Sequence, residues 1–440
     1  MRKHRKKIND DNQRIKNDRR TLYKRIFYTI GVLIIYHFLG YVTIPGVNSK
    51  AMLAASQNEG LAVLSMFSGG NFQSFSIMSM GVTAYVSAQI VVQLLQANVV
   101  PKLTEWSKQG QTGREKLNQL IRVLTLIFGF VQALGITAGI NSITGYDMLV
   151  DSSWQGYLLI CTLLTAGTFA AMWMGDLITE NGLGNGVSVI ISTGIIAQWS
   201  QLADKFIKAI TKHHQLNWKI LIATIIGLIV MITFIVWFNQ SERRLPIQYA
   251  RRETLTGDES FLPLKINVPG VVPVIFAGSI IAIPQTLLML FEDQSTKTWY
   301  KVLANFFTLN TSTGIIIYGV LITIFTYIYS SIQLDPEKLA DNFTKQEAYI
   351  PSVYPGNPTA IYIQNTLNYL AFPGSLFLVV ISVVPLIVSK NEAFGLQLGI
   401  TGSSLLIVVG VILEIGRQIN GLRKKNDYAG FLSTKYEFTR

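Results

Sequence analysis

The chain carries the stretch Gly81-Val82-Thr83-Ala84-Tyr85-Val86-Ser87-Ala88 and echoes it later as Gly270-Val271-Val272-Pro273-Val274-Ile275-Phe276-Ala277. Both copies begin with Gly-Val, have a branched apolar residue five places after the glycine, and have an alanine two places later. Each copy opens the second apolar segment of its half of the chain. This pattern indicates an internally duplicated membrane protein whose working site lies where the two copies face each other.

The composition also favours a membrane protein. Half of the 440 residues are hydrophobic and only 14% are charged, whereas about 25% of the residues in a soluble domain are charged. The net charge of +12 is compatible with a nucleic-acid partner, but the aromatic-basic interleaving of a nucleic-acid surface is absent. The single cysteine, Cys161, lies in an apolar run, and the histidines lack ligand spacing. We therefore predict no disulfide, metal site, cofactor or catalytic group.

About 20 apolar residues are needed to span a bilayer, and by that measure we expect ten transmembrane helices. They lie near residues 24–44, 75–98, 119–140, 155–177, 185–203, 218–239, 270–291, 312–333, 369–389 and 399–420. The predicted fold is an all-α polytopic membrane protein. Five spans precede the loop at 204–217 and five follow it. Because an odd number of spans inverts the second half relative to the first, we expect two inverted five-helix halves, 24–203 and 218–420.

Basic residues indicate which side of the membrane each end occupies. The arm at 1–23 is rich in lysine and arginine, and the loops after the second and sixth spans are also basic. Lysine and arginine accumulate on cytoplasmic loops, so we expect the arm and the tail at 421–440 in the cytoplasm and the loop at 141–154 outside. The apolar run at 26–44 is too long for a cleavable signal and no small-residue cleavage site follows it, so we predict that it is retained.

Inverted repeats occur in many transport proteins, and the duplication alone leaves several families open. Coupled transporters often carry charged groups inside their spans, but here His37 is the one ionisable residue well inside an apolar run. The repeated segments instead present Val86, Ile90 and Ile275. Ordinary helix packing explains such residues. The alternative is an apolar constriction that seals a wide pore by dewetting.

A longer motif narrows these alternatives. The run Met172-Trp173-Met174-Gly175-Asp176-Leu177-Ile178-Thr179-Glu180-Asn181-Gly182-Leu183-Gly184-Asn185-Gly186-Val187-Ser188 follows a membrane span and not a strand, which argues against a nucleotide-binding loop. It resembles the signature of the SecY family, the central channel subunit of the protein translocase. Further segments that resemble the family are Ile44-Pro45-Gly46-Val47, Met66-Phe67-Ser68-Gly69-Gly70, residues 76–93, Pro263-Leu264-Lys265-Ile266-Asn267 and Ser403-Ser404-Leu405-Leu406-Ile407-Val408.

The resemblance implies a clamshell of two halves hinged at 204–217, with a pore between them. By resemblance, a pore ring falls on Val86, Ile90, Ile191, Ile275 and Ile407, with Ser279 next to it. A plug near 63–74, which includes Met66, Phe67, Ser68, Gly69 and Gly70, would close the resting pore from outside. The second and seventh helices would form a lateral gate toward lipid, where Gln89 and Gln93 are polar. Hydrogen bonds to a neighbouring helix explain these glutamines equally well.

The cytoplasmic loops resemble docking sites for a ribosome or for a SecA-type motor ATPase. The candidate docking residues are Arg243, Arg244, Arg251, Arg252 and Tyr354. The positive-inside rule alone also explains the arginines. The other implied partners are small membrane subunits of the SecE and SecG kind, an unfolded secretory polypeptide and membrane lipid. The resemblance implies no nucleic acid apart from ribosomal RNA. It implies a channel subunit of the plasma membrane and not an enzyme, because a partner hydrolyses ATP.

Several residues depart from the family's pattern. The family usually has glycine at the positions of Glu347 and Ser352, arginine at Tyr354 and at His37, and proline at Ala84. These departures favour a divergent paralogue, of the kind found in the accessory Sec systems of Gram-positive bacteria, with a dedicated motor and serine-rich glycosylated adhesins as cargo. A housekeeping SecY is the alternative within the family. A secondary transporter of small solutes is the alternative from another class.

Overall fold

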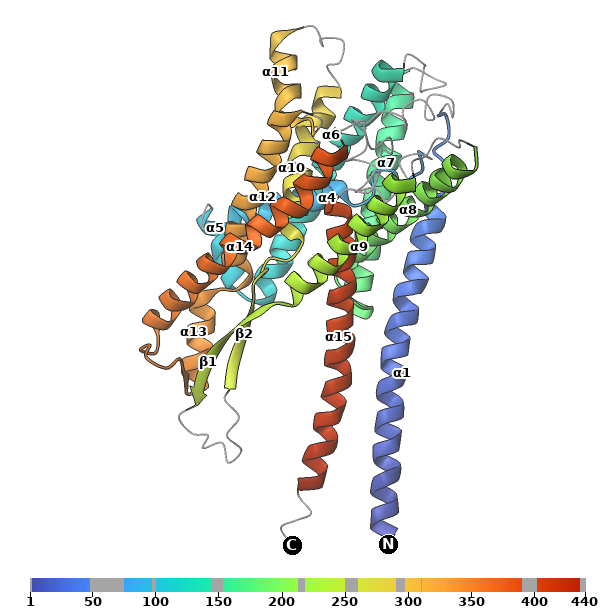
Figure 1. Cartoon of the computed structure of the whole chain (residues 1–440). Helices are drawn as coiled ribbons and strands as arrows, with labels where there is room; N and C mark the ends of the chain where they lie inside the picture. The colour runs from blue at the N-terminus through green and yellow to red at the C-terminus, as the bar shows by residue number, and fades with distance from the viewer. Residues whose placement is uncertain are drawn as a thin grey trace.

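The structure is a computed structural model, and it describes residues 2–47, 75–96, 100–144, 153–212, 218–249, 260–289, 297–309, 311–389 and 402–435. These residues form long helices and one small sheet (Figure 1). The helices of the first half are α1 (Arg2–Leu39), α4 (Thr83–Gln96), α5 (Pro101–Lys108), α6 (Gln111–Thr144), α7 (Trp154–Asn181) and α8 (Gly186–Lys212). Those of the second half are α9 (Trp218–Gln240), α10 (Val272–Met289), α11 (Thr298–Phe307), α12 (Ser312–Gln333), α13 (Pro336–Lys345), α14 (Asn357–Ser389) and α15 (Gly402–Lys435).

Each predicted span overlaps a helix, although α4 begins later than the predicted 75–98 and α14 begins earlier than the predicted 369–389. In the described part of the chain, six helices are long and apolar enough to cross a membrane, namely α1, α6, α7, α12, α14 and α15. Helix α4 passes that test only together with α5, from which a bend separates it. Three more helices contain shorter apolar segments, at Gly186–Trp199, Ile225–Gln240 and Val272–Leu288. Six, one and three make ten apolar helices, which is consistent with the ten predicted spans.

The two halves share one packing scheme. In the first half α4 packs on α6, α6 on α7 and α7 on α8, and in the second half α10 packs on α12, α12 on α14 and α14 on α15. In Figure 1, α1 rises from the end that carries both termini, whereas α9 descends toward that end. The second half is therefore inverted relative to the first. The halves meet where α10 packs on α4 and α6, and where α15 packs on α8 and α1.

A small antiparallel sheet lies at the same end as the termini (Figure 1). Its strands are β1 (Glu242–Tyr249), β2 (Ser260–Lys265) and β3 (Ala348–Tyr349), in the order β2-β1-β3. These strands were not predicted from the sequence. Within β1 only Leu245 and Ile247 are buried, which is the alternating pattern of a strand with one covered face. Two alternating apolar residues are too short a sequence pattern to predict a strand. The membrane part is helical, as predicted.

Helix α8 extends farther than predicted. The fifth span was expected to end at 203 and to be followed by a hinge loop at 204–217, but α8 continues to Lys212. Residues 213–217 lie outside the described part. The sequence from 201 to 212 contains neither glycine nor proline, so nothing in it ends a helix, although its charges end the apolar run. Span length and helix length therefore differ at this boundary.

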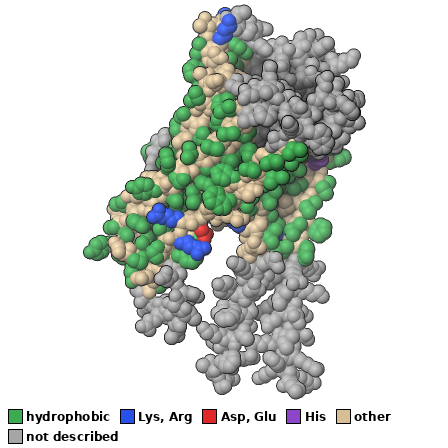
Figure 2. Space-filling view, in the orientation of Figure 1, with side chains coloured by type: hydrophobic (Ala, Val, Ile, Leu, Met, Phe, Trp, Pro, Cys, Tyr) green, Lys and Arg blue, Asp and Glu red, His purple; other side chains and the backbone are tan. Residues whose placement is uncertain are grey.

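The outer surface is strongly apolar. Figure 2 shows hydrophobic side chains covering one face of the helical body, with lysine and arginine side chains near its lower margin and at its upper tip. Exposed apolar side chains occur on helices far apart in the sequence, for example Phe38 on α1, Val230 on α9 and Leu376 on α14. A soluble monomer rarely exposes such contiguous apolar area. The surface fits helices whose outer faces are in contact with lipid.

Candidate functional site

The duplicated glycines begin the site, and they adopt the same conformation. Gly81 has φ 52° and Gly270 has φ 64°, in the left-handed region that favours glycine. The N–H of Gly81 donates to the carbonyl of Met78 at 2.9 Å, and that of Gly270 donates to the carbonyl of Asn267 at 3.4 Å. Helices α4 and α10 each start two residues after their glycine. The sequence repeat therefore corresponds to a repeated turn that directs two helices into the interface between the halves.

The predicted ring residues lie in one buried apolar cluster. Val86 and Ile90 come from α4, Ile191 from α8, Ile275 from α10 and Ile407 from α15, and none is more than 5% exposed. Branched side chains from both halves therefore pack in one apolar cluster. Ser279, one helical turn after Ile275, is also buried. The predicted ring residues are therefore brought together by the fold, and their role as a pore ring stays a prediction.

The cluster also contains residues that were not predicted to belong to the pore ring. Ile195 and Leu406 are buried in it. Ile195 stands one turn after Ile191 on α8, and helical spacing could have identified it. Leu406 is the neighbour of Ile407, and only the packing of α15 against other helices places both side chains in the interior.

Helices α4 and α10, the predicted gate helices, pack against each other. Gln89 and Gln93 on α4 are both half-buried. The Oε1 atom of Gln93 is buried, and among the described residues it has no hydrogen-bond partner. Such an unpaired buried acceptor costs about 1–3 kcal/mol. The hydrogen bond to a neighbouring helix that could explain Gln93 is therefore open only to its amide nitrogen. The packing around α4 therefore leaves this oxygen unsatisfied.

The glycine-rich motif forms a tight loop between α7 and α8. The N–H of Leu183 donates to Thr29 Oγ1 on α1 at 3.1 Å, and the N–H of Gly184 donates to Gln418 Oε1 on α15 at 2.8 Å. The N–H of Gly186 donates to Thr179 Oγ1 at 2.9 Å. The loop therefore joins α7 and α8 to α1 and α15, which are far from it in the sequence.

Gly182 is constrained by packing and Gly184 mainly by its backbone conformation. A Cβ on Gly182 would lie 2.5 Å from Thr29 Oγ1, and one on Gly184 would lie 3.2 Å from Ile415 Cγ1 on α15. Gly184 also has φ +82°, so a side chain there would strain the backbone as well. Asn185 then caps α8, because its Oδ1 accepts from the N–H of Val187 at 3.1 Å.

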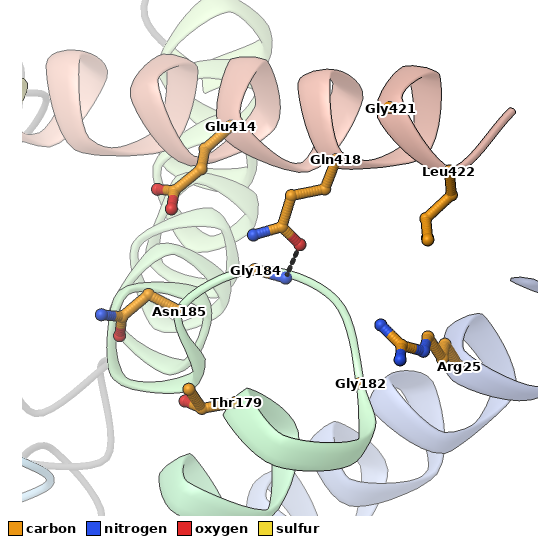
Figure 3. Close-up of a pocket in the computed structure, with 9 residues that line it drawn as sticks. All are labelled: Arg25, Thr179, Gly182, Gly184, Asn185, Glu414, Gln418, Gly421 and Leu422. Carbon is orange, nitrogen blue, oxygen red and sulfur yellow. Dashed lines mark hydrogen bonds between the residues drawn. The ribbon is translucent and has the colours of Figure 1, made fainter. Parts of the chain in front are cut away.

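An open pocket of about 600 Å³ lies beside this loop (Figure 3). The residues that line it are Arg25, Thr179, Gly182, Gly184, Asn185, Glu414, Gln418, Gly421 and Leu422. In Figure 3, Arg25 of α1 and Gln418 of α15 point toward the loop from different sides. The pocket belongs to the junction between the halves and is separate from the apolar cluster.

The candidate docking arginines differ in their surroundings. Arg244 Nε lies 3.0 Å from Glu242 Oε1, and the guanidinium lies 4.6 Å from the centre of the Phe261 ring on β2. Arg244 therefore has partners within the hairpin formed by β1 and β2. Arg243 is exposed and lies on the opposite face of β1. The sequence analysis treated the two residues alike, because strand alternation was not predicted there.

The loop after the eighth predicted span, called the eighth loop, comprises residues 346–356 between α13 and α14. It presents Tyr354, which is 82% exposed. The loop also contains two residues other than glycine in the left-handed region, Glu347 with φ 53° and Ser352 with φ 68°. These are the two positions at which the resemblance leads us to expect glycine. The backbone conformation that glycine favours is thus present, although glycine is not.

Some predicted site residues lie outside the described part of the chain. They are the plug residues Met66, Phe67, Ser68, Gly69 and Gly70, together with Arg251 and Arg252. Their roles remain predictions.

The chain was compared with known proteins. A profile of the SecY family matches residues 76–416. "Protein translocase subunit SecY 2" of Lactobacillus kefiranofaciens subsp. kefiranofaciens is 56% identical over 405 residues, which cover 92% of this chain and 99% of that protein. "Protein translocase subunit SecY 1" of the same organism is 45% identical over 414 residues, with 93% and 96% covered. A solved structure described as a protein conducting channel superposes with a TM-score of 0.69 at 15% identity, over 92% of this chain and 93% of that one.

These matches agree with the architecture derived above. The family profile covers the repeated turns, the glycine-rich loop and the apolar cluster, from α4 to α15. The solved channel shares the fold over nearly the whole chain. The chain belongs to the SecY family.

Proposed function

We propose that this chain is the central channel subunit of a Sec-type translocase and conducts unfolded polypeptides across the plasma membrane. The observation that carries the proposal is the apolar cluster at the meeting point of two inverted repeats, with Val86 and Ile275 contributed by matched positions. A solute transporter needs a polar binding site at that place. A polypeptide channel needs a deformable apolar seal, because segments of any sequence must pass without being held.

The surroundings of His37 argue against the transporter alternative. His37 is the ionisable residue inside an apolar run that could have served a coupled transporter. Its side chain is exposed on α1, with Nε2 3.5 Å from the hydroxyl of Tyr41 and outside the apolar cluster. Asp176, near the end of α7, lies 3.6 Å from Arg122 on α6. Neither residue provides a substrate site in the interior.

We infer an orientation with both termini, the β1–β2 hairpin and the eighth loop in the cytoplasm. These segments lie at one end of the molecule (Figure 1), and the arm and the hairpin loop carry the basic residues that the positive-inside rule assigns to the cytoplasm. Arg243 and Tyr354 are then the exposed candidates for contact with a motor ATPase. Small SecE- and SecG-like subunits would cover part of the outer apolar surface. Energy comes from the motor and not from this chain.

Within the family, we propose a divergent second copy and not a housekeeping channel. The chain is 56% identical to a protein named SecY 2 and 45% identical to SecY 1 of the same organism. The departures at Glu347, Ser352 and Tyr354 occur in the loop assigned to motor contact. An accessory system with its own motor, and with serine-rich glycosylated adhesins as cargo, accounts for both observations.

Reconstitution tests the channel function. The chain, with its small subunits, is placed in vesicles with a motor ATPase and an unfolded preprotein. We expect protease-protected preprotein inside the vesicles that depends on ATP and on this chain. Uptake of a small solute with no protected preprotein, under any motor encoded in the same genome, would refute the proposal.

A further inference from the structure

A chain of hydrogen bonds runs from the glycine-rich loop of the first half to the start of α10. Its first link is the bond from the N–H of Gly184 to Gln418 Oε1, at 2.8 Å (Figure 3). This bond crosses from one half to the other. It ends on α15, one residue after Arg417.

Arg417 supplies the second link. Its Nη2 donates to the main-chain carbonyl of Asn239 at 2.6 Å. Asn239 is next to the last residue of α9, where carbonyls lack helical partners and the helix dipole favours a cation. The neighbouring strand β2 also approaches this turn of α15. Burial lowers the pKa of Lys265, the positive charge of Arg417 adds to that effect, and the carboxylate of Glu414 opposes it.

Asn267 supplies the third link. Its Nδ2 donates to Asn239 Oδ1 at 3.0 Å and to the carbonyl of Gly270 at 3.1 Å. Gly270 forms the turn that starts α10, a predicted gate helix. Asn267 is only 2% exposed, and within the described residues its Oδ1 is buried without a hydrogen-bond partner. The arrangement leaves an acceptor unsatisfied at the joint between the hairpin and α10, which weakens this joint relative to a fully paired one.

We propose that Arg417 and Gln418 couple the cytoplasmic hairpin to the opening of the channel. The two residues are adjacent on α15 and hold different parts of the molecule: Gln418 holds the loop of the first half, and Arg417 holds the end of α9, from which β1 continues. A displacement of the hairpin is therefore passed to the junction of the halves and also, through Asn267, to α10. Both are positioning residues, because neither touches the pore. This inference rests on the proposed function, because the docking of a motor is what displaces the hairpin.

The test uses Arg417→Ala and Gln418→Ala in the full chain with its small subunits. The matched control is Ile412→Ala, an exposed apolar residue on α15, 58% exposed, that takes no part in the chain of bonds. Two quantities are measured in vesicles: motor affinity, and the motor-induced decrease in the yield of an oxidant-formed disulfide crosslink between cysteines placed in α4 and α10. We expect each variant to bind the motor within about twofold of the parent and to lose about tenfold in gate opening, which corresponds to about 1.4 kcal/mol.

The double variant distinguishes coupling from independent damage. If Arg417 and Gln418 act in series, the double variant loses no more gate opening than either single variant does. If they act independently, the fold-losses in gate opening multiply. Multiplying effects, or full gate opening in both single variants, would overturn the proposal. Loss of motor binding in parallel with gate opening would also overturn it, because the residues would then only stabilise the docking surface.

A second measurement separates this inference from the proposed function. Amide hydrogen exchange requires neither a motor nor a substrate. Gln418→Ala should raise exchange by about tenfold at 266–270 as well as at Gly184, while Ile412→Ala changes neither. Raised hydrogen exchange at Gly184 alone would refute the proposed coupling to α10. If the parent chain conducts no polypeptide but the exchange result holds, the channel proposal fails and the mechanical link stands.

Discussion

Replacing Ser352 by glycine should stabilise the eighth loop, although it removes atoms from the protein. A tight turn spans residues 350–353. In it, the N–H of Val353 donates to the carbonyl of Ile350 at 3.1 Å. Proline at the second position and a positive φ, here 68°, at the third are the features of a type II turn. The third position of that turn favours glycine, and here it holds a serine.

The magnitude follows from two opposing effects. Holding an L-residue in the left-handed region costs about 1–2 kcal/mol. Glycine removes that strain but loses about 0.5–1 kcal/mol more conformational entropy on folding. The side chain of Ser352 is exposed, and no hydrogen bond of its hydroxyl is seen in the described part of the chain, so little else is lost. The difference spans about 0–1.5 kcal/mol, and we expect the local opening free energy of the turn to rise by about 0.5–1 kcal/mol, the middle of that range.

Native-state hydrogen exchange at Val353 measures this directly, because a loop in a large membrane protein opens locally well below global unfolding. A gain of about 0.5–1 kcal/mol slows exchange by about two- to fivefold. The control is Gly356→Ala in the same loop. Gly356 has φ +91° with no atom within 4 Å of an added Cβ, so the change introduces strain without a clash and should speed exchange. Faster exchange in Ser352→Gly, or an unchanged rate in Gly356→Ala, would refute the reasoning.

Three further predictions address the channel. Ile275→Asn or Ile407→Asn places a polar group in the apolar cluster at a cost of about 1–3 kcal/mol and should raise resting ion conductance in reconstituted vesicles; unchanged conductance and unchanged signal selection in both variants would reject the ring. A cysteine at Asp147 should react with an impermeant thiol reagent in intact cells while one at Lys108 does not, and the reverse pattern would overturn the orientation; the native Cys161 is buried and provides the unreactive background. Because Tyr354 cannot form the charge-assisted contact of an arginine, worth about 1.5–3 kcal/mol, the chain should rescue general secretion poorly when a housekeeping SecY is depleted and no second motor is present, and full rescue would exclude the accessory role.

The parts of the fold that were predictable are those with a local physical signature. Ten apolar runs predict ten helices, because a bilayer demands about 20 apolar residues for each crossing. Gly81 and Gly270 predict a repeated turn, because a left-handed residue at a helix start favours glycine. Val86 and Ile275 were then identifiable as equivalent positions. Each inference uses residues close together in the sequence.

The parts that were missed depend on contacts between distant residues. Gln418 and Gly184 are 234 positions apart, and nothing in either local sequence indicates the other. The hairpin was not predicted because β1 contains arginines and a proline and is only eight residues long. Arg243 and Arg244 could be separated only after the strand had been identified, because the two faces of a strand alternate. The end of α8 was misplaced because a polar helix continues beyond the apolar run.

The eighth loop shows how its geometry is retained while its chemistry changes. Helix α13 ends in a turn in which the N–H of Glu347 donates to the carbonyl of Thr344 at 3.2 Å, and Phe343 and Ala348 on either side are buried in one cluster. That contact is typical of a glycine-terminated helix. Because this packing and the ring of Pro351 fix the backbone, Glu347 and Ser352 are held in the left-handed region despite its cost. Under the proposed function, a motor would meet a similar loop path that carries a carboxylate and a phenol. On this argument the specificity of the loop resides in its side chains, and a change of Tyr354 to arginine should restore contact with a housekeeping motor without rebuilding the loop.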